Sequence, residues 1–261
     1  MLSHNQIKYI NSLKIKKFRH QNNAFIVEGE KSVNELLHSS IKVVKVFALP
    51  GWFEVNSYML GGTNVAFQEI TADELVKVSD LVTPNQVLAI AELPEIQIPE
   101  PARHTGMALA LDGIRDPGNM GTIIRTADWF GISKIICSID SVDMYNTKVI
   151  QATMGSFSRV NVIYTNLLSF FQSLPPEMPV FGAMLEGPDI TRKTFNRPGI
   201  ILIGSESHGI SATLLPYVNE PLHIPLFSQP GIKYHAESLN ASIANGIICY
   251  EICKQLHKNN F

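Results

Sequence analysis

The sequence of 261 residues predicts an α/β protein, with a mostly parallel sheet in its C-terminal part and a smaller α/β domain before it. Short apolar runs alternate with segments of helical periodicity, most clearly after residue 105. Hydrophobic residues make up 45% of the chain and charged residues 17%, so a sizeable core is expected and a disordered chain is excluded. A proline-rich stretch over residues 93–101 indicates an extended connector between two domains.

The N-terminal block, residues 1–95, shows the pattern of a small α/β domain. Thr71 and Glu74 have the spacing of a capping box, so a helix is expected to begin there. The other elements follow from apolar periodicity and β-branched runs. The expected elements are a helix over 30–38, a strand over 42–49, a strand over 64–70, the helix after Thr71 and a strand over 86–93.

Residues 96–104 form the predicted linker, and residues 105–261 form the second predicted domain, in which the alternation is more regular. Strands that alternate with helices imply a mostly parallel sheet with helices on both faces. The expected strands are 107–111, 134–138, 160–164, 180–185 and 200–204, with a further strand ended by Pro225. The expected helices are 119–130, 147–154, 166–173, 212–217 and 237–256.

Several classes of protein are excluded by composition. No apolar run approaches the roughly 18 to 20 residues that span a bilayer, and the N-terminus lacks the apolar region of a secretory signal, so a soluble, cytoplasmic protein without membrane contact is expected. Three cysteines do not build a disulfide framework. Cys249, Cys253 and His257 share one helix face, but a straight helix cannot supply a tetrahedral metal site alone, so packing is expected and no metal is predicted.

Basic residues gather at the start of the chain. Residues 1–50 hold eight basic and three acidic side chains. Lys14, Lys16, Lys17 and Arg19 form a cluster that could bind the phosphates of a nucleic acid, because each neutralised phosphate releases counterions. An ordinary solvated surface explains this cluster equally well.

Three loops that follow predicted strands carry unusual residues, and ligands of parallel sheets bind at such strand ends. In the first, after Leu111, a glycine-rich turn opens a helix that contains Asn119 and Arg125, which could hold a phosphate or carboxylate. The spacing is neither that of a dinucleotide fingerprint nor that of a phosphate loop. A plain strand-to-helix turn is the competing interpretation.

The second loop begins at Gly204 and contains one carboxylate, Glu206, among small residues. Gly204 and Gly209 permit close approach of the backbone to a ligand. A serine hydrolase, with Ser207 as nucleophile and His223 or His235 as base, is a weaker alternative, because no acidic residue falls clearly into the third catalytic place.

The third loop follows Ile224 and Pro225 and leads into the last helix, which Ser238 or Asn240 could cap. Leu239 lies on an apolar helix face with Ile243 and Ile247 that is typical of a core or a subunit interface.

Taken together, the three motifs resemble those of the SpoU/TrmH-type RNA 2′-O-ribose methyltransferases, within the SPOUT superfamily. They are Asn119-x-Gly121-x-x-x-Arg125, Gly204-x-Glu206-x-x-Gly209-x-Ser211, and Ile224-Pro225 followed by Ser238-Leu239-Asn240-x-Ser242. The resemblance covers most of residues 107–255. The N-terminal block, with Phe25-Ile-Val-Glu28-Gly29, is similar to the ribosomal-protein-like substrate-binding domain that often precedes this catalytic domain.

The resemblance implies a C-terminal trefoil knot, a homodimer, an rRNA or tRNA substrate, and S-adenosylmethionine as methyl donor. The catalytic residues would be Asn119, Arg125, Glu206, Ser238 and Asn240. The methyl donor would contact Gly204, Glu206, Ile224, Pro225, Leu226 and Leu239. Lys14, Lys16, Lys17 and Arg19 would contact RNA.

This sequence departs from the family pattern in two places. Ser205 and Ser207 stand where relatives often carry Asn and Gly, and the link between Pro225 and Ser238 is long. The main alternative function is a catalytically silent RNA-binding relative. A guanidinium with a pKa above about 12 is a poor base, so Arg125 is expected to clamp phosphate and stabilise the emerging alkoxide, while a carboxylate, amide or water receives the proton.

Overall fold

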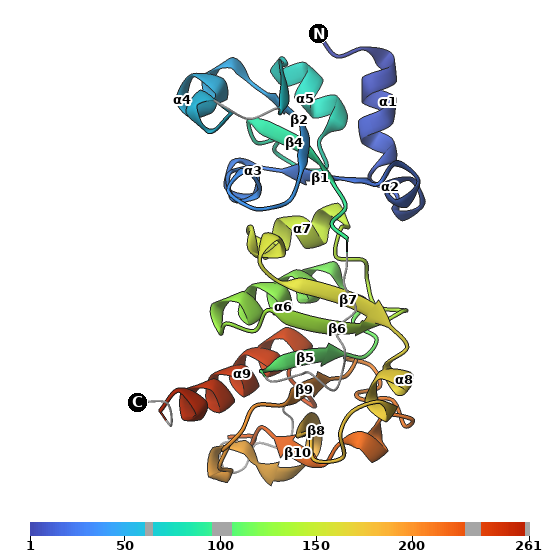
Figure 1. Cartoon of the computed structure of the whole chain (residues 1–261), viewed down its shortest axis with the longest axis vertical. Helices are drawn as coiled ribbons and strands as arrows, with labels where there is room; N and C mark the ends of the chain where they lie inside the picture. Colours follow the sequence, from blue (N-terminus) through green and yellow to red (C-terminus); the bar gives the residue numbers. More distant parts are fainter. Residues whose placement is uncertain (61–64, 96–105, 228–235, 259–261) are drawn as a thin grey trace. The chain divides into compact units, whose positions relative to one another are not determined.

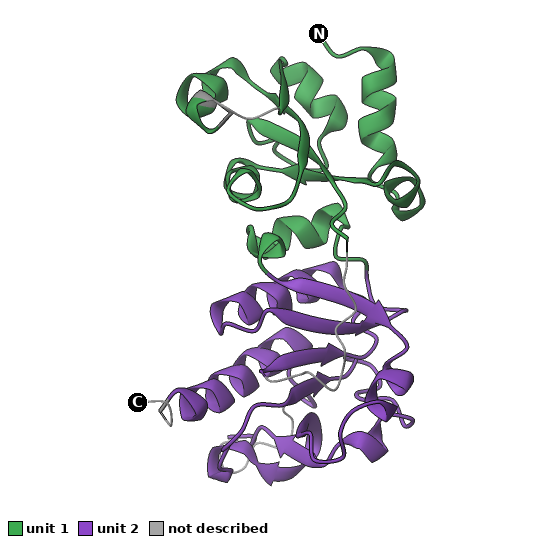
Figure 2. Ribbon diagram, viewed as in Figure 1, with its two compact units in different colours: residues 1–96, 143–159 green, residues 97–142, 160–261 purple. Residues whose placement is uncertain are grey.

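The structure is a computed structural model that describes residues 1–60, 65–95, 106–227 and 236–258. It contains two compact units, each with its own sheet (Figures 1 and 2). Unit 1 comprises residues 1–96 and 143–159, and unit 2 comprises residues 97–142 and 160–261. The predicted linker, residues 96–104, lies outside the described residues.

The sheet of unit 1 has the strand order β1-β4-β2-β3, in which β4 pairs antiparallel with β1 and with β2, and β2 pairs parallel with β3. The capping box predicted at Thr71 and Glu74 is confirmed, because each side chain accepts a hydrogen bond from the other residue's backbone N–H. The elements are α1 (His4–Ser12), α2 (Lys16–Asn22), β1 (Ala24–Glu28), α3 (Glu30–Leu37), β2 (Val43–Ala48), α4 (Pro50–Leu60), β3 (Ala66–Glu69), α5 (Ala72–Val78) and β4 (Val87–Glu92).

A segment from the middle of the chain completes unit 1. Residues 143–159 contain α7 (Thr147–Thr153) and the short 3₁₀-helix η2 (Ser156–Ser158), and they pack with residues 1–96. The ring of Phe25 lies 4.7 Å from that of Tyr145 and 6.2 Å from that of Phe157, centroid to centroid. The prediction had placed this segment in the second domain, because its strand–helix alternation gives no sign of the unit on which the helix packs.

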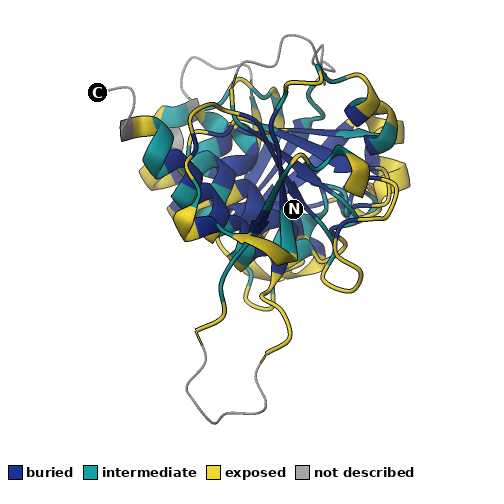
Figure 3. Ribbon diagram, turned by 90° about the horizontal axis from the view of Figure 1, so that it is seen from below, coloured by how far each residue is buried: buried dark blue, intermediate teal, exposed yellow. Residues whose placement is uncertain are grey.

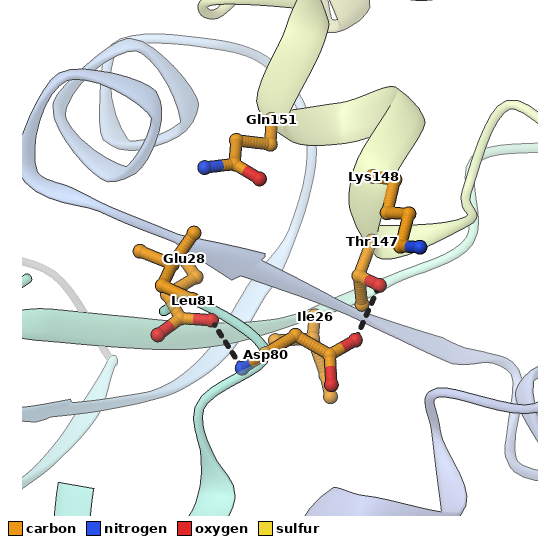
Figure 4. A pocket seen from close by; sticks show the side chains of 7 residues that line it. All are labelled: Ile26, Glu28, Asp80, Leu81, Thr147, Lys148 and Gln151. Atoms are coloured by element: carbon orange, nitrogen blue, oxygen red, sulfur yellow. Dashed lines mark hydrogen bonds between the residues drawn. The ribbon is translucent and has the colours of Figure 1, made fainter. Parts of the chain in front are cut away.

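Polar contacts hold α7 beside the strand end of β1 and the loop after α5 (Figure 4). Asp80 accepts a hydrogen bond of 2.6 Å from the Thr147 hydroxyl, and its backbone N–H donates to Glu28 over 3.0 Å. Lys14 forms an ion pair of 2.9 Å with Asp80. Glu28, Asp80 and Thr147 line a small pocket together with Ile26, Leu81, Lys148 and Gln151.

The six-stranded sheet of unit 2 is parallel throughout, in the order β10-β8-β9-β5-β6-β7, which confirms the predicted class. Its elements are β5 (Ala108–Leu111), α6 (Pro117–Trp129), β6 (Lys134–Ser138), β7 (Asn161–Thr165), α8 (Leu167–Gln172), β8 (Val180–Asp189), η3 (Ile190–Arg192), β9 (Ile200–Ile203), η4 (Leu215–Tyr217), β10 (Glu220–His223) and α9 (Ala241–Lys258).

The central strands of unit 2 are buried between helices (Figure 3). On one side, α8 contributes Leu167 and Phe171 to a core cluster with alternate residues of β5 and β9. Helices α6 and α9 pack against each other, and α9 also contacts β8 and β9 (Figure 1). The packing of these strands and helices therefore positions the ends of β5 and β9 near the beginnings of α6 and α9.

Some expected elements differ from those observed. Helices α1, α2 and α4 and strand β1 were not predicted, although Ser3 and Gln6 form a capping box at the start of α1. The helix expected over 212–217 is only the single turn η4. Helix α9 begins at Ala241 rather than at 237, because Asn240 Oδ1 accepts hydrogen bonds from the backbone N–H of Ser242 and of Ile243.

Candidate active site

Three segments that are distant in the sequence meet at one edge of the sheet of unit 2. Neighbouring parallel strands β5 and β9 both end there. Asn119 lies in the first turn of α6, Glu206 follows β9, and Asn240 precedes α9. The order of the strands therefore brings together one residue from each of the three sequence motifs.

Glu206 is the centre of this group. Its Oε1 accepts hydrogen bonds from Asn119 Nδ2 at 2.7 Å and from Asn240 Nδ2 at 2.6 Å. Asn240 Nδ2 also lies 2.9 Å from Asn119 Oδ1. The Ser242 hydroxyl donates to Asn240 Oδ1 over 2.7 Å, which turns the amide nitrogen of Asn240 toward the carboxylate. These contacts fix the orientation of Glu206, and Oε2 accepts no hydrogen bond from the part of the chain that the structure describes.

The loop that carries Glu206 is a tight turn between Ser205 and Gly209. Their backbones exchange two hydrogen bonds, of 3.0 and 2.8 Å. At Gly204 an added Cβ would lie 2.0 Å from the carbonyl carbon of Gly209. A side chain cannot fit at Gly204, because the backbone of Gly209 lies against it, whereas the glycine was expected from the sequence to make room for a ligand.

A second contact joins the first two motifs and was not predicted. Asp112 Oδ2 accepts hydrogen bonds from the backbone N–H of Ser211 at 2.7 Å and from its hydroxyl at 2.6 Å. Asp112 follows β5 directly, and Ser211 follows the turn after β9. A carboxylate immediately after a buried strand was the available signal, but its partner 99 residues away cannot be read from sequence spacing.

The helix that carries Asn119 begins with a well-defined cap. Asp116 accepts a hydrogen bond of 2.7 Å from the Asn119 backbone N–H, and Pro117 occupies the first turn. Arg125 lies farther along α6, where its side chain is exposed. Within the described ranges no ion pair or hydrogen bond joins it to Glu206, Asn119 or Asn240.

The other predicted site residues of unit 2 have varied surroundings. Ser238 and Leu239 are exposed just before Asn240. Ile224 and Pro225 are half-buried after β10, and Leu226 is exposed. The long link between Pro225 and Ser238 falls largely on residues 228–235, outside the described residues, as does His235.

The predicted RNA-contacting residues of unit 1 divide into two kinds. Lys16 and Lys17 are exposed on α2, whereas Lys14 is partly buried in its pair with Asp80. Arg19 is only 2% exposed. Its guanidinium pairs with Asp143 and donates to the carbonyl groups of Leu13 and Lys14. Its predicted contact with RNA is therefore corrected, because the guanidinium is buried and already used inside unit 1.

The described parts of the chain contain neither the serine–histidine pair that a serine hydrolase needs nor a group of metal ligands. The Ser207 hydroxyl contacts Nδ1 of the adjacent His208 at 2.7 Å, not His223. No cluster of potential metal ligands occurs among the residues described. Burial raises the pKa of the Cys249 thiol, and His257 Nδ1 contacts the backbone carbonyl of Cys253. No described helix is both long enough and apolar enough to cross a membrane.

Comparisons with known proteins give a consistent result. The model of the SpoU rRNA methylase family matches residues 106–250, and that of the MRM3-like substrate-binding domain matches residues 4–89. The chain is 29% identical to the 23S rRNA (guanosine(2553)-2′-O)-methyltransferase RlmP of Bacillus subtilis over 95% of both chains.

Solved structures show the same architecture. A TrmH-family protein from Porphyromonas gingivalis superposes with a TM-score of 0.82 at 35% identity, over 97% of this chain and 98% of that one. An AdoMet-bound rRNA methyltransferase from Sinorhizobium meliloti superposes with a TM-score of 0.83 at 27% identity, over 98% of this chain and 97% of that one.

Proposed function

Because this chain belongs to the SpoU rRNA methylase family, we propose that it transfers a methyl group from S-adenosylmethionine to a ribose 2′-hydroxyl of ribosomal RNA. The observation that carries the proposal is the convergence of Asn119, Glu206 and Asn240 at the ends of β5 and β9. The relative of known target argues for a guanosine of large-subunit RNA in the cytoplasm.

The carboxylate of Glu206 receives the proton that leaves the 2′-hydroxyl. When bound, S-adenosylmethionine would supply a methyl group on a positively charged sulfonium: the bond from the 2′-oxygen to the methyl carbon would form as the carbon–sulfur bond breaks, and neutral S-adenosylhomocysteine would leave. Asn119 and Asn240 hold Oε1 of Glu206 by their amide groups, so Oε2 faces the nucleophile in a fixed orientation. Arg125 binds the phosphate of the target nucleotide and stabilises the alkoxide, since a guanidinium stays charged near neutral pH.

The residues around the turn fit the methyl donor. The backbone of Gly204 packs against that of Gly209, so the loop offers polar backbone groups without an intervening side chain. Leu226 and Leu239 are exposed apolar side chains on either side of the loop outside the described residues, and an adenosine would cover them. Ile224 and Pro225 complete this contact, and Ser238 holds the substrate beside Asn240.

Two features of the family extend to this chain in the proposal: the C-terminal trefoil knot and the homodimer. An exposed apolar strip on α6 and α9 supports the dimer. It contains Trp129, which is 84% exposed, with Ile243, Ile247 and Tyr250 on α9. Ile243, Ile247 and Tyr250 follow one another on one face of α9, and such a face could bind the same face of a second copy.

Unit 1 binds the RNA substrate through the exposed side of α2. Lys16, Lys17 and His20 are exposed there, and phosphates attract such a group without regard to base sequence. The match to a substrate-binding domain over residues 4–89 supports this role.

Two measurements test the proposed function. Calorimetric titration with S-adenosylmethionine should show binding, whereas a catalytically silent RNA-binding relative predicts no heat and no thermal shift. Ribosomal RNA from a strain lacking the gene should accept methyl groups from the wild-type protein, and ribose-methylation mapping should identify one nucleotide that loses its methyl group in that strain.

Variants connect the activity to the site. Asn240→Ala removes an amide donor from Glu206 and should lower kcat by about 100-fold. Asn196→Ala is the matched control, because Asn196 is an exposed asparagine of the same unit before β9. Equal kcat values for the two variants would contradict the proposed site.

A further inference from the structure

We propose that Arg115 binds a phosphate of the substrate RNA next to the target ribose, by exchanging its ion pair with Asp140 for that phosphate. The inference rests on the proposed function and adds a substrate contact to the same site. Arg115 lies between β5 and α6, one residue before the helix cap Asp116. The same loop leads directly to Asn119.

The position of Gly113 places this ion pair beside the Glu206 turn. Gly113 has a φ of +70°. A Cβ built on it would lie 3.6 Å from Ser205 Cβ and 3.7 Å from Asp140 Oδ2. Ser205 precedes Glu206 in the tight turn. Asp140 and the turn that carries Glu206 therefore both lie close to Gly113. Arg115 follows Gly113 by two residues and pairs with Asp140, so it lies at the same edge of the sheet.

The pair is built so that its cation can change partners. Arg115 Nη2 lies 3.0 Å from Asp140 Oδ2, and the two side chains are 78% and 55% exposed. Exposed ion pairs contribute little to stability, so separating this one costs little. Asp140 would keep its other contact, because Oδ1 accepts a hydrogen bond of 2.7 Å from the Ser138 hydroxyl.

Charge at the site indicates what Arg115 would bind. The proposed function assigns Arg125 to the phosphate of the target nucleotide. The groups that meet around Glu206 are one carboxylate and two neutral amides, so a further cation is needed for the next phosphate of the chain. Every ribose in an RNA chain is flanked by phosphates, and a guanidinium binds phosphate with paired donors. The carboxylate of the methyl donor has similar chemistry, but the large exposure of Arg115 favours the polymer.

The test compares Arg115→Ala with Arg197→Ala. Arg197 is an exposed arginine just before β9, at the opposite end of the parallel strands, so its loss removes the same charge away from the site. Methylation of ribosomal RNA from a strain lacking the gene is measured over a range of KCl concentrations, and S-adenosylmethionine binding is measured by calorimetry. A thermal melt checks that each variant is folded.

Arg115→Ala should raise the KM for RNA about tenfold near 0.1 M salt. It should also reduce the slope of log KM against log salt by about 1, which corresponds to the loss of one phosphate contact. Its affinity for S-adenosylmethionine should stay within twofold of wild type. A KM within twofold of the Arg197→Ala value would overturn the proposal, and a weakened affinity for the methyl donor would assign Arg115 to that carboxylate instead.

Asp140→Asn separates a substrate contact from a merely structural pair. It breaks the ion pair and leaves Arg115 in place, so the KM for RNA should be unchanged or lower. A loss equal to that of Arg115→Ala would mean that the ion pair itself matters, and the proposal would fail. A wild-type protein that neither binds S-adenosylmethionine nor methylates RNA would refute the proposed function. An active wild type with an unchanged KM for RNA in Arg115→Ala would refute only the role of Arg115.

Discussion

At the scale of single residues, the site depends on what each atom touches rather than on residue type alone. Gly204 is an example, because it is a glycine whose requirement comes from contact with Gly209 and not from an unusual φ. The roles of Asn119 and Asn240 likewise come from their contacts, since the amide groups of both donate hydrogen bonds to one oxygen of Glu206.

Gly204→Ala should disrupt the turn that carries Glu206. The added Cβ would meet backbone atoms only 2.0 Å away, so the loop must move. We expect a loss of roughly 1–3 kcal/mol in unfolding free energy, together with loss of S-adenosylmethionine binding in calorimetry. Gly51→Ala is the control, because nothing lies within 4 Å of a Cβ there. Normal binding by Gly204→Ala would show that the turn tolerates the shift.

Arg125→Lys tests whether the planar guanidinium is needed. Lysine keeps the charge but not the paired donors, so kcat should fall by about 100-fold. Because Arg125 is exposed and outside the Glu206 group, the affinity for S-adenosylmethionine and the melting temperature should not change. Single-turnover methylation measures the effect, and near-normal turnover would exclude a bidentate role.

Glu28→Gln should change stability in a way that depends on pH. Burial raises the pKa of Glu28, although hydrogen bonds from Ser79 and Asp80 act in the opposite direction. Burial therefore penalises the ionised side chain in the folded state. The neutral variant should unfold at a higher denaturant concentration than wild type at pH 7, and the difference should shrink as pH falls toward the ordinary value of about 4.3. A constant difference would contradict this assignment.

At the scale of elements, α7 shows that a helix can be predicted from local sequence while its packing cannot. Its pattern of apolar residues and its cap at Asn146 are local, and the helix was expected at residues 147–154. Its neighbour β1 lies more than a hundred residues away in the chain. Nothing in the sequence around α7 records that distance, so the prediction kept the segment in the second domain, as the family match over residues 106–250 also does, whereas its contacts group it with residues 1–96.

Arg19→Met should destabilise unit 1 by breaking its attachment to Asp143. The side chains of Arg19 and Asp143 are 3% and 11% exposed, so the carboxylate left behind stays largely buried without its partner. We expect a loss of about 3 kcal/mol in the free energy of unfolding. The double variant Arg19→Met with Asp143→Asn should recover part of this, because no unpaired charge remains.

Arg192→Ala is the control for this experiment. Its side chain is 87% exposed and its pair with Asp189 is 3.6 Å long. Removing it should change stability by less than about 1 kcal/mol in the same denaturant titration. If Arg19→Met were equally mild, the buried pair would not fasten residues 143–159 to unit 1.

At the scale of the whole molecule, the sequence predicted the parallel class of the unit 2 sheet and most of the strands, but not the mixed sheet of unit 1. Periodicity and capping residues are local signals, which is why α3, α5, α6 and α8 were expected close to their observed bounds. The meeting of Asn119 and Glu206 followed from the rule that ligands bind where parallel strands end. The pairs Asp112–Ser211 and Arg19–Asp143 could not be predicted from the sequence, because they depend on exact register and on long-range packing.

The insertion of residues 143–159 into unit 1 has a consequence for synthesis of the protein. Residues 1–96 emerge from the translating ribosome first, but β1 then still lacks α7, and Phe25 lacks both aromatic neighbours. The leading unit therefore lacks these contacts until β5, α6 and β6 of the trailing unit have also emerged, although its core cluster is drawn from residues 2–90 alone. During that interval its exposed apolar surface is available to a chaperone, and a pause in elongation before residue 159 would prolong the exposure.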